Sequence, residues 1–370
     1  MTNPHSPEIY INRSIPKDSS IRGDFFRDQT AIIHSMPFRR LKHKTQVFFS
    51  PNNDHVCTRI EHVLHVATIG STICKGLNNN GWGLNIEMAY AIGLGHDLGH
   101  SPFGHAGETA LNKKLNADYK FIHEVHGLRV VDKLCNNGTG LNLTYGVRDG
   151  IINHNGEVIQ QSLKPSQTIN NLEIIKDRKS FPCSYEGCIV RISDKIAYLG
   201  RDIEDALIAN FISIEDIPSE IREEVGETNG EIINNLVIDV IETSKTIDEI
   251  KLSDRMFEKV NILQKFNYKH IYGHPIILEY KQKGEKILEE IFDFLLDLHS
   301  EHGKDFDYYL KNPLTLIQHF GNYFQRYENV YESEGMVPKR LICDFIAGMT
   351  DGYALDAYNQ IKIPRPIKFK

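Results

Sequence analysis

The sequence predicts an almost entirely α-helical protein with, at most, a minor β hairpin. Hydrophobic residues recur at helical spacing over most of the 370 residues, strand-like alternation is scarce, and no internal repeat or low-complexity tract is evident. The composition is 41% hydrophobic and 25% charged, as in ordinary globular proteins. A chain of this length can form one large core or two subdomains.

The N-terminal part of the chain predicts an arm followed by helices. Residues 1–22 are polar and contain prolines, which indicates an irregular arm. Residues 24–48 alternate hydrophobic pairs with basic residues at helical spacing, and Pro37 predicts a break between two short helices. Residues 58–77 carry hydrophobic side chains on two adjoining helical faces, so we expect a long helix there.

The middle of the chain combines helices with one polar region. Residues 121–134 and 188–209 show helical spacing, and 188–209 carries a hydrophobic stripe on one face and polar residues on another. The region 153–184 has few hydrophobic residues. We expect it to be a surface insertion, a lid or an oligomer contact.

The C-terminal part is predicted to be helical and to pack on the core. Residues 231–247 and 287–298 have helical spacing throughout, and 344–358 indicates a closing helix. Residues 270–280 suit either a short β piece or a linker before a long helix. The expected organisation is an arm (1–22), a core (23–210) and a C-terminal helical region (211–370).

Charge, cysteines and hydropathy limit the classes of function. The formal net charge of −7 gives no bulk basic field for nucleic acid or anionic membrane. The six cysteines form no CxxC pair, and the first residues lack the hydrophobic core of a signal peptide, so we expect a reduced, cytoplasmic protein. No hydrophobic run approaches the ~18 residues of a membrane helix.

The chemistry is predicted to centre on the stretch NIEMAYAIGLGHDLGHSPFGHAGE, residues 85–108. Ala89, Ile92 and His96 stand at i, i+3 and i+7, so the imidazole belongs to the buried stripe of a helix. Asp97 follows at once, and nearby glycines allow close helix approach and a sharp turn. A buried carboxylate must be paired or coordinated, and a divalent metal is the simplest partner.

Four residues on three predicted helices make a candidate metal set: His62, His96, Asp97 and Asp194. Two imidazoles and two carboxylates suit one divalent ion, with Mn, Mg, Fe, Co, Ni and Zn all compatible. Taken singly, each signal is weak, because a lone helical histidine is more often a packed core residue. The combination favours a site.

These residues stand in an order that resembles the HD-domain metal phosphohydrolases, and the surrounding motifs resemble the deoxynucleoside triphosphate triphosphohydrolases, the dGTPase-like family. The resemblance covers most of the chain and implies an HD-domain helical bundle as the core within 23–210. The matching motifs are RDQTAIIHSMPFRRLKHKTQVF (27–48), TRIEH (58–62), GHDLGHSPFGHAGE (95–108), FIHE with LRVV (121–131), SDKIAYLGRDIEDA (193–206) and IAGMTDGYA (346–354).

The resemblance also implies a role for each matched residue. His62, His96, Asp97 and Asp194 would ligate one metal. His105 would be the principal acid/base, with Glu108 one turn later orienting it, and His123 would be a second active-site histidine. The residues implied to contact substrate are Gln46, Arg59, Lys195, Tyr198 and Asp202.

The implied reaction is hydrolysis of a dNTP, with dGTP as one candidate for the preferred substrate, to deoxynucleoside and inorganic triphosphate. Two alternatives stay open: an HD-type nucleotidase or phosphodiesterase, and a nucleotide- or single-stranded-DNA-binding regulator with weak hydrolysis. Besides the dNTP substrate, the family resemblance implies an allosteric nucleotide or single-stranded DNA and a homo-oligomer as partners. His65, His126, His154 and His274 match no family position, and for them we expect packing or surface roles.

Overall fold

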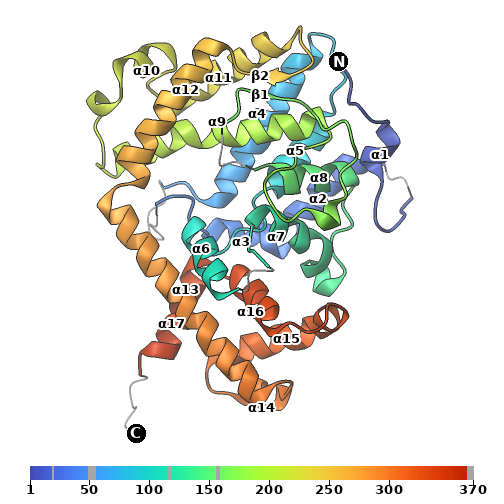
Figure 1. The fold of residues 1–370 in the computed structure, drawn as a ribbon, viewed down its shortest axis with the longest axis vertical. Helices are drawn as coiled ribbons and strands as arrows, with labels where there is room; N and C mark the ends of the chain where they lie inside the picture. The colour runs from blue at the N-terminus through green and yellow to red at the C-terminus, as the bar shows by residue number, and fades with distance from the viewer. Residues whose placement is uncertain (19–20, 49–55, 116–118, 156–158, 365–370) are drawn as a thin grey trace.

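The computed structural model describes residues 1–18, 21–48, 56–115, 119–155 and 159–364, and helices dominate them (Figure 1). The all-α prediction is confirmed. The α-helices are α1 (Pro7–Ile11), α2 (Asp24–Ile33), α3 (Met36–Arg40), α4 (Arg59–Asn78), α5 (Ile86–Gly95), α6 (His105–Lys114), α7 (His123–Arg129), α8 (Tyr145–Asn153), α9 (Tyr185–Ile208), α10 (Ser219–Glu224), α11 (Asn229–Ser244), α12 (Asp254–Asn267), α13 (Pro275–His302), α14 (Phe306–Lys311), α15 (Thr315–Ser333), α16 (Pro338–Ala347) and α17 (Asp351–Lys362). Short helical turns are η1 (Leu41–His43), η2 (Val130–Leu134), η3 (Asn136–Gly138), η4 (Leu172–Ile174), η5 (Ile214–Asp216) and η6 (Tyr268–Tyr272), and the strands are β1 (Ser162–Leu163) and β2 (Ile250–Lys251).

The first hydrophobic core gathers around α4, α5 and α9, which pack against one another. Thr58 and Glu61 form a capping box where α4 begins, and the Ser184 hydroxyl caps the first turn of α9. Helices α4 and α5 meet at Gly93, where an added Cβ would lie 2.5 Å from the Cα of Ala67. The absence of a side chain at this position therefore lets the two helices approach closely.

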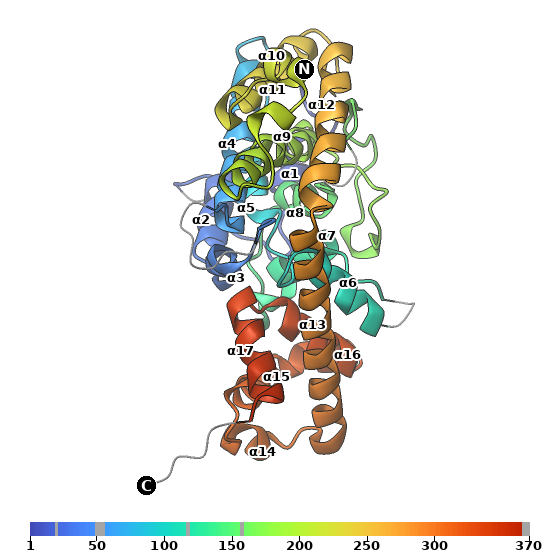
Figure 2. The same cartoon turned by 90° about the vertical axis from the view of Figure 1, so that its left-hand side faces the viewer.

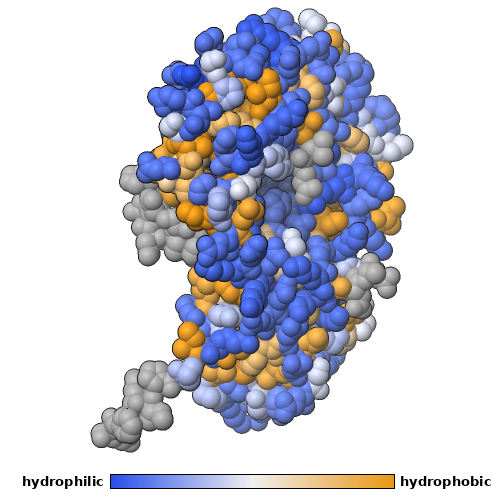
Figure 3. Space-filling view, turned by 60° about the vertical axis from the view of Figure 1, so that its left-hand side comes forward, coloured by the Kyte–Doolittle hydropathy of each residue, from blue (hydrophilic) through white to orange (hydrophobic). Residues whose placement is uncertain are grey.

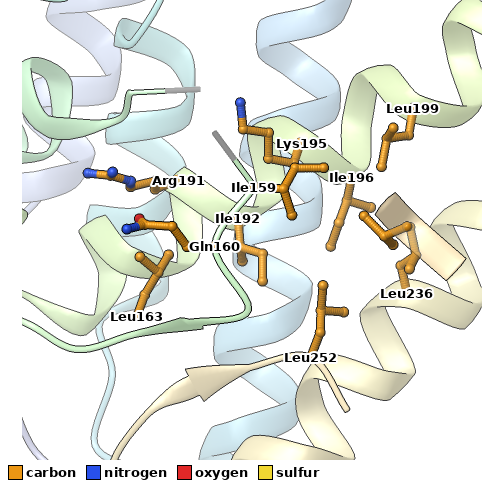
Figure 4. A pocket seen from close by; sticks show the side chains of 11 residues that line it. Ile159, Gln160, Leu163, Arg191, Ile192, Lys195, Ile196, Leu199, Leu236 and Leu252 are labelled. Atoms are coloured by element: carbon orange, nitrogen blue, oxygen red, sulfur yellow. The ribbon is translucent and has the colours of Figure 1, made fainter. Parts of the chain in front are cut away.

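The opposite side of α9 packs on α11 and on the residues after β2. Figure 4 shows Ile192 and Ile196 of α9 around one apolar space with Leu236 of α11 and Leu252. All four side chains are buried. The hydrophobic stripe predicted for 188–209 is confirmed.

A second hydrophobic core lies in the C-terminal region, where α13 packs with α6, α16 and α17, and α15 with α14 and α16. Helix α13 has 28 residues, and at a rise of 1.5 Å per residue it is about 42 Å long. Ile277, near its start, belongs to the first core, whereas Leu288 and Leu295 belong to the second. Figures 1 and 2 show α13 running the length of the lower part of the molecule, so this helix ties the two cores together.

The N-terminal arm differs in part from its prediction. It contains α1, and the Tyr10 hydroxyl donates a hydrogen bond to the carbonyl oxygen of Cys183, 2.8 Å away. Arg13 Nη1 lies 2.6 Å from Asp28 Oδ1, with both side chains buried. Outside α1 the described residues of the arm form no helix and only an isolated bridge at Arg13, as expected of an irregular arm, but composition did not reveal α1 or these tertiary partners.

Of the two alternatives predicted for residues 270–280, the structure has the linker before a long helix, since η6 ends at Tyr272 and α13 begins at Pro275. Two other predictions for helices and strands are corrected. The closing helix predicted for 344–358 is two helices, α16 and α17, separated by residues 348–350. The minor β structure pairs β1 antiparallel with β2, two segments far apart in sequence, and so is not a hairpin.

The surface of the described residues mixes hydrophilic and hydrophobic side chains. Figure 3 shows one face that is hollowed near its middle, with hydrophilic side chains around the hollow. Across the described ranges, the helices are either too short or too polar to cross a membrane.

Candidate active site

Three helices from distant parts of the chain converge on the four residues of the candidate metal set. Helix α4 supplies His62, the C-terminal end of α5 supplies His96 and Asp97, and the middle of α9 supplies Asp194. His62 Nε2 lies 2.9 Å from Asp194 Oδ1, and His96 Nε2 lies 3.7 Å from the same oxygen and 3.5 Å from Asp97 Oδ1. The structure thus brings together all four residues that the sequence singled out.

The donor atoms of this set fit a divalent metal. The Nδ1–H of His96 donates to the carbonyl oxygen of Gly93, 2.8 Å away, which leaves the lone pair of Nε2 pointing into the site. His96 Nε2 is buried and has no hydrogen-bond partner within the described part of the chain. The ligand atoms of His62, His96 and Asp194 all lie within 4.8 Å of one another, so one ion can contact them together.

Electrostatics keep both carboxylates of the set ionised. Burial alone would raise the pKa of Asp194, but the hydrogen bond from His62 and the neighbouring imidazole of His96 outweigh it and hold the pKa well below its usual range. The pKa of Asp97 is likewise lowered against burial, by His100, His96 and Arg59. Carboxylates that stay charged when buried are suited to a cation.

Arg59, which we expected only to contact substrate, also contacts a candidate metal ligand. Its Nη1 lies 2.7 Å from Asp97 Oδ2, with both side chains buried, so it forms an ion pair with one candidate ligand. Arg59 also lines the cavity beside the metal set, which leaves the guanidinium within reach of a substrate there.

A second cluster of titratable residues adjoins the first. His100 Nε2 lies 3.1 Å from Asp97 Oδ1, and the His100 ring stacks on His123 with ring centroids 3.8 Å apart. His105 begins α6 and keeps solvent-exposed surface. The surrounding protein and the nearby charge of His123 lower the pKa of His105, which favours the neutral imidazole.

Glu108 pairs with a histidine other than the one we expected. The Nδ1–H of His123 donates to Glu108 Oε2, 2.9 Å away, and lies 3.3 Å from Glu124 Oε2. Burial would lower the pKa of His123, but the Glu124 and Glu108 carboxylates raise it to about 8. The ligand atoms of His105, Glu108 and His123 still lie within 4.8 Å of one another, so the three form one cluster.

A cavity of about 210 Å³ opens beside the two clusters. Four of the five residues predicted to contact substrate line it: Gln46, Arg59, Tyr198 and Asp202. Lys195 does not, because its stem lies against the apolar space of Figure 4 while its Nζ lies 5.4 Å from the centre of the Tyr198 ring.

Several residues of the cavity were missed by the sequence analysis. His154, which we expected to pack or lie on the surface, is buried in the cavity wall with its ring 4.9 Å from that of His96. Tyr272 donates a hydrogen bond to Asp202, whose pKa burial raises to about 7. Three more missed residues, Tyr268, Tyr280 and Lys281, come from η6 and the first turns of α13, where the sequence suggested only a short β piece or a linker before a helix.

The loop between α5 and α6 carries several of the residues that line the cavity. Hydrogen bonds from residues outside the cavity lining hold its backbone in place. Lys44 Nζ donates to the carbonyl oxygens of His100 and, at 2.9 Å, Ala347. His126 Nδ1 lies 2.9 Å from the carbonyl oxygen of Gly99, where an added Cβ would come within 2.1 Å of the His123 carbonyl oxygen. The loop therefore has little freedom to shift.

Comparison with known proteins finds two matching domain families. Residues 59–199 match the HD domain, and residues 250–360 match the phosphohydrolase-associated domain. The metal set and the second cluster fall within the first match.

Curated relatives match over nearly the whole chain. Three of them, from Caldanaerobacter subterraneus subsp. tengcongensis, Desulfatibacillum aliphaticivorans and Clostridium tetani, each carry the name deoxyguanosinetriphosphate triphosphohydrolase-like protein. They are 38%, 38% and 36% identical to this chain, over 94%, 94% and 93% of it and 87%, 90% and 87% of their own lengths.

Proposed function

This chain belongs to the family of deoxyguanosinetriphosphate triphosphohydrolase-like proteins and is a phosphohydrolase, and from this premise we propose that it hydrolyses dNTPs to deoxynucleoside and inorganic triphosphate. The observation that carries the proposal is the convergence of His62, His96, Asp97 and Asp194 beside a cavity lined by further histidines. The unpartnered, buried Nε2 of His96 supports a metal role for this set.

The metal would be held by these four residues. Bound there, it would supply Lewis-acid stabilisation of negative charge on the α-phosphate and would lower the pKa of a water nucleophile. Arg59, in the cavity wall, would add positive charge for the triphosphate through its guanidinium, whereas Lys195, which does not line the cavity, would not contact the substrate. Gln46, Tyr198 and Asp202 would contact the sugar and the phosphates from the cavity wall.

The two histidines of the second cluster suit opposite proton-transfer roles. His105, kept neutral, would accept the proton of the attacking water as the new P–O bond forms. His123, which is charged at neutral pH, would donate a proton to the 5′ oxygen as the P–O5′ bond breaks. Each transfer typically accelerates a reaction by about 10²- to 10⁴-fold.

Partners form a further part of the proposal. A second cavity of about 750 Å³, lined by Arg40 of α3 and by Tyr323 and Arg326 of α15, supports binding of an allosteric nucleotide. We also propose a homo-oligomer in the cytoplasm. Single-stranded DNA binding is tested by a gel shift whose strength falls with salt.

Product analysis tests the reaction. The purified protein is incubated with each dNTP and NTP in the presence of Mg²⁺ or Mn²⁺, and the products are separated by anion exchange. We expect deoxynucleoside and triphosphate from dNTPs. Release of pyrophosphate or orthophosphate instead would show that a different bond is cut, and it would overturn the proposal.

A further inference from the structure

One side chain of the polar region after α8, Arg178, contacts both carboxylates beside His123 in the second cluster. Its Nη2 lies 2.8 Å from Glu108 Oε1 and its Nε lies 2.8 Å from Glu124 Oε1. The other oxygens of these carboxylates, the two Oε2 atoms, face His123 Nδ1. One guanidinium therefore grips both carboxylates that hold this imidazole.

The charges of this network balance only when Arg178 is present. The Glu108 and Glu124 side chains are 10% and 1% exposed, so neither is well solvated. Two buried carboxylates against one imidazolium would leave a net negative charge, and uncompensated buried charge is costly. The guanidinium supplies the missing positive charge with a planar fork that suits two carboxylates.

The geometry of Arg178 is itself fixed by the chain. Asn155 Nδ2, beside the cavity residue His154, donates to the Arg178 carbonyl oxygen at 3.0 Å. The Arg178 side chain is 22% exposed, and Arg178 does not line the cavity of about 210 Å³. Its Nη2 lies 3.2 Å from His123 Nδ1, outside the cavity lining, and part of the side chain reaches solvent.

We propose that Arg178 is a positioning residue, which locks Glu108 and Glu124 in the orientation that aims His123 Nε2 at the reacting phosphate. The inference rests on the proposed function, because it assigns His123 to the reaction. It also gives the region 153–184 a role in the active site, since this region carries the outer half of the charge network that supports the second active-site histidine.

The test compares Arg178→Ala with Lys179→Ala, a matched control whose side chain is 89% exposed on the same segment. We expect kcat to fall by about 10- to 100-fold in Arg178→Ala, as for other residues that orient a functional histidine, with KM and metal content near those of the wild type. Because the Arg178 side chain borders solvent, added guanidinium should restore much of the lost kcat, whereas tetramethylammonium at equal ionic strength should not. Arg178→Lys should be intermediate, since one ammonium cannot bridge both carboxylates as the fork does.

Each outcome is decisive. If Arg178→Ala keeps the kcat of the Lys179→Ala control, or loses activity that guanidinium does not restore, the positioning role is refuted. If Arg178→Ala fails to fold, the same comparison is made with Arg178→Lys, whose unchanged kcat would refute the role. A wild-type protein that is inactive on every dNTP would instead overturn the proposed function.

Discussion

Asp351 should hold the active-site loop in place from the C-terminal region. Its Oδ1 accepts from the backbone N–H of Phe103 at 3.0 Å, and its Oδ2 accepts from the backbone N–H of Thr45 at 2.9 Å. Phe103 and Gly104 both have positive φ, 60° and 58°, directly before His105. A non-glycine residue in this conformation persists only where its surroundings hold it.

The magnitude follows from those two bonds. A hydrogen bond to a charged group contributes about 1.5–3 kcal/mol, so Asp351→Ala, which leaves one buried and one half-buried donor without their acceptor, should lower the free energy of unfolding by about 3–6 kcal/mol. Asp351→Asn keeps one acceptor oxygen, so it should cost about half as much, ~1.5–3 kcal/mol. The lost charge at the start of α17 adds only about 0.3–1 kcal/mol.

Urea denaturation followed by circular dichroism measures these values, with Asp356→Asn as the control because Asp356 is exposed on the same helix. The control should match the wild type within about 0.5 kcal/mol. A cost below about 1 kcal/mol for Asp351→Ala would refute the reasoning, since it would mean that the two backbone donors find other partners without loss.

Three further predictions concern the contacts around the site. Burial lowers the pKa of Lys44 to about 7, below the ~10.4 of an unfolded lysine, so between these values the unfolded chain binds the extra proton and stability rises with pH. Urea denaturation at about pH 7 and about pH 8.5 should show the wild type gaining about 1–2 kcal/mol relative to Lys44→Met, and equal pH slopes would contradict this. Asp194→Asn should purify without bound metal, as measured by elemental analysis. His105→Gln should keep the metal and lose turnover in the product assay. A fully metallated Asp194→Asn would contradict the ligand set. Gly99→Ala should destabilise the protein by about 3 kcal/mol because its Cβ meets backbone atoms of α7, whereas Gly352→Ala, with open space around it, should be neutral or stabilising; similar melting temperatures for the two variants would show that the loop can yield.

Helical periodicity, together with the family resemblance, predicted that the four candidate metal ligands lie on helices that pack together. Helix α9 has a long, regular hydrophobic stripe, and α5 is hydrophobic on nearly every face, so both are buried in the first core with α4. His62 and Asp194 stand on α4 and α9, and His96 directly follows α5. Their meeting therefore follows from packing that the sequence encodes locally.

The orientation of Glu108 could not be predicted in the same way. Its spacing of three residues from His105 is a helical neighbourhood, but α7 places His123 Nδ1 at 2.9 Å from the same carboxylate. The spacing of residues within one helix does not reveal a hydrogen-bond donor that a different helix places beside them. Arg178 escaped notice for a related reason, since it lies in a segment without periodicity, where position is set by side-chain hydrogen bonds such as that from Asn155.

The dependence of the site on the C-terminal region follows from the irregular backbone of the loop between α5 and α6. Outside a helix, buried N–H and C=O groups need individual partners. Asp351 of α17 binds Phe103 N, while Lys44, which binds His100 O, is itself held by Ala347 O at the end of α16. All four candidate metal ligands lie within residues 59–199, yet the loop that leads into His105 gets its backbone partners partly from residues 338–362. The loop between α5 and α6 makes few backbone hydrogen bonds within itself. The helices of the second core must therefore be in place for this loop to keep its shape beside the candidate active site.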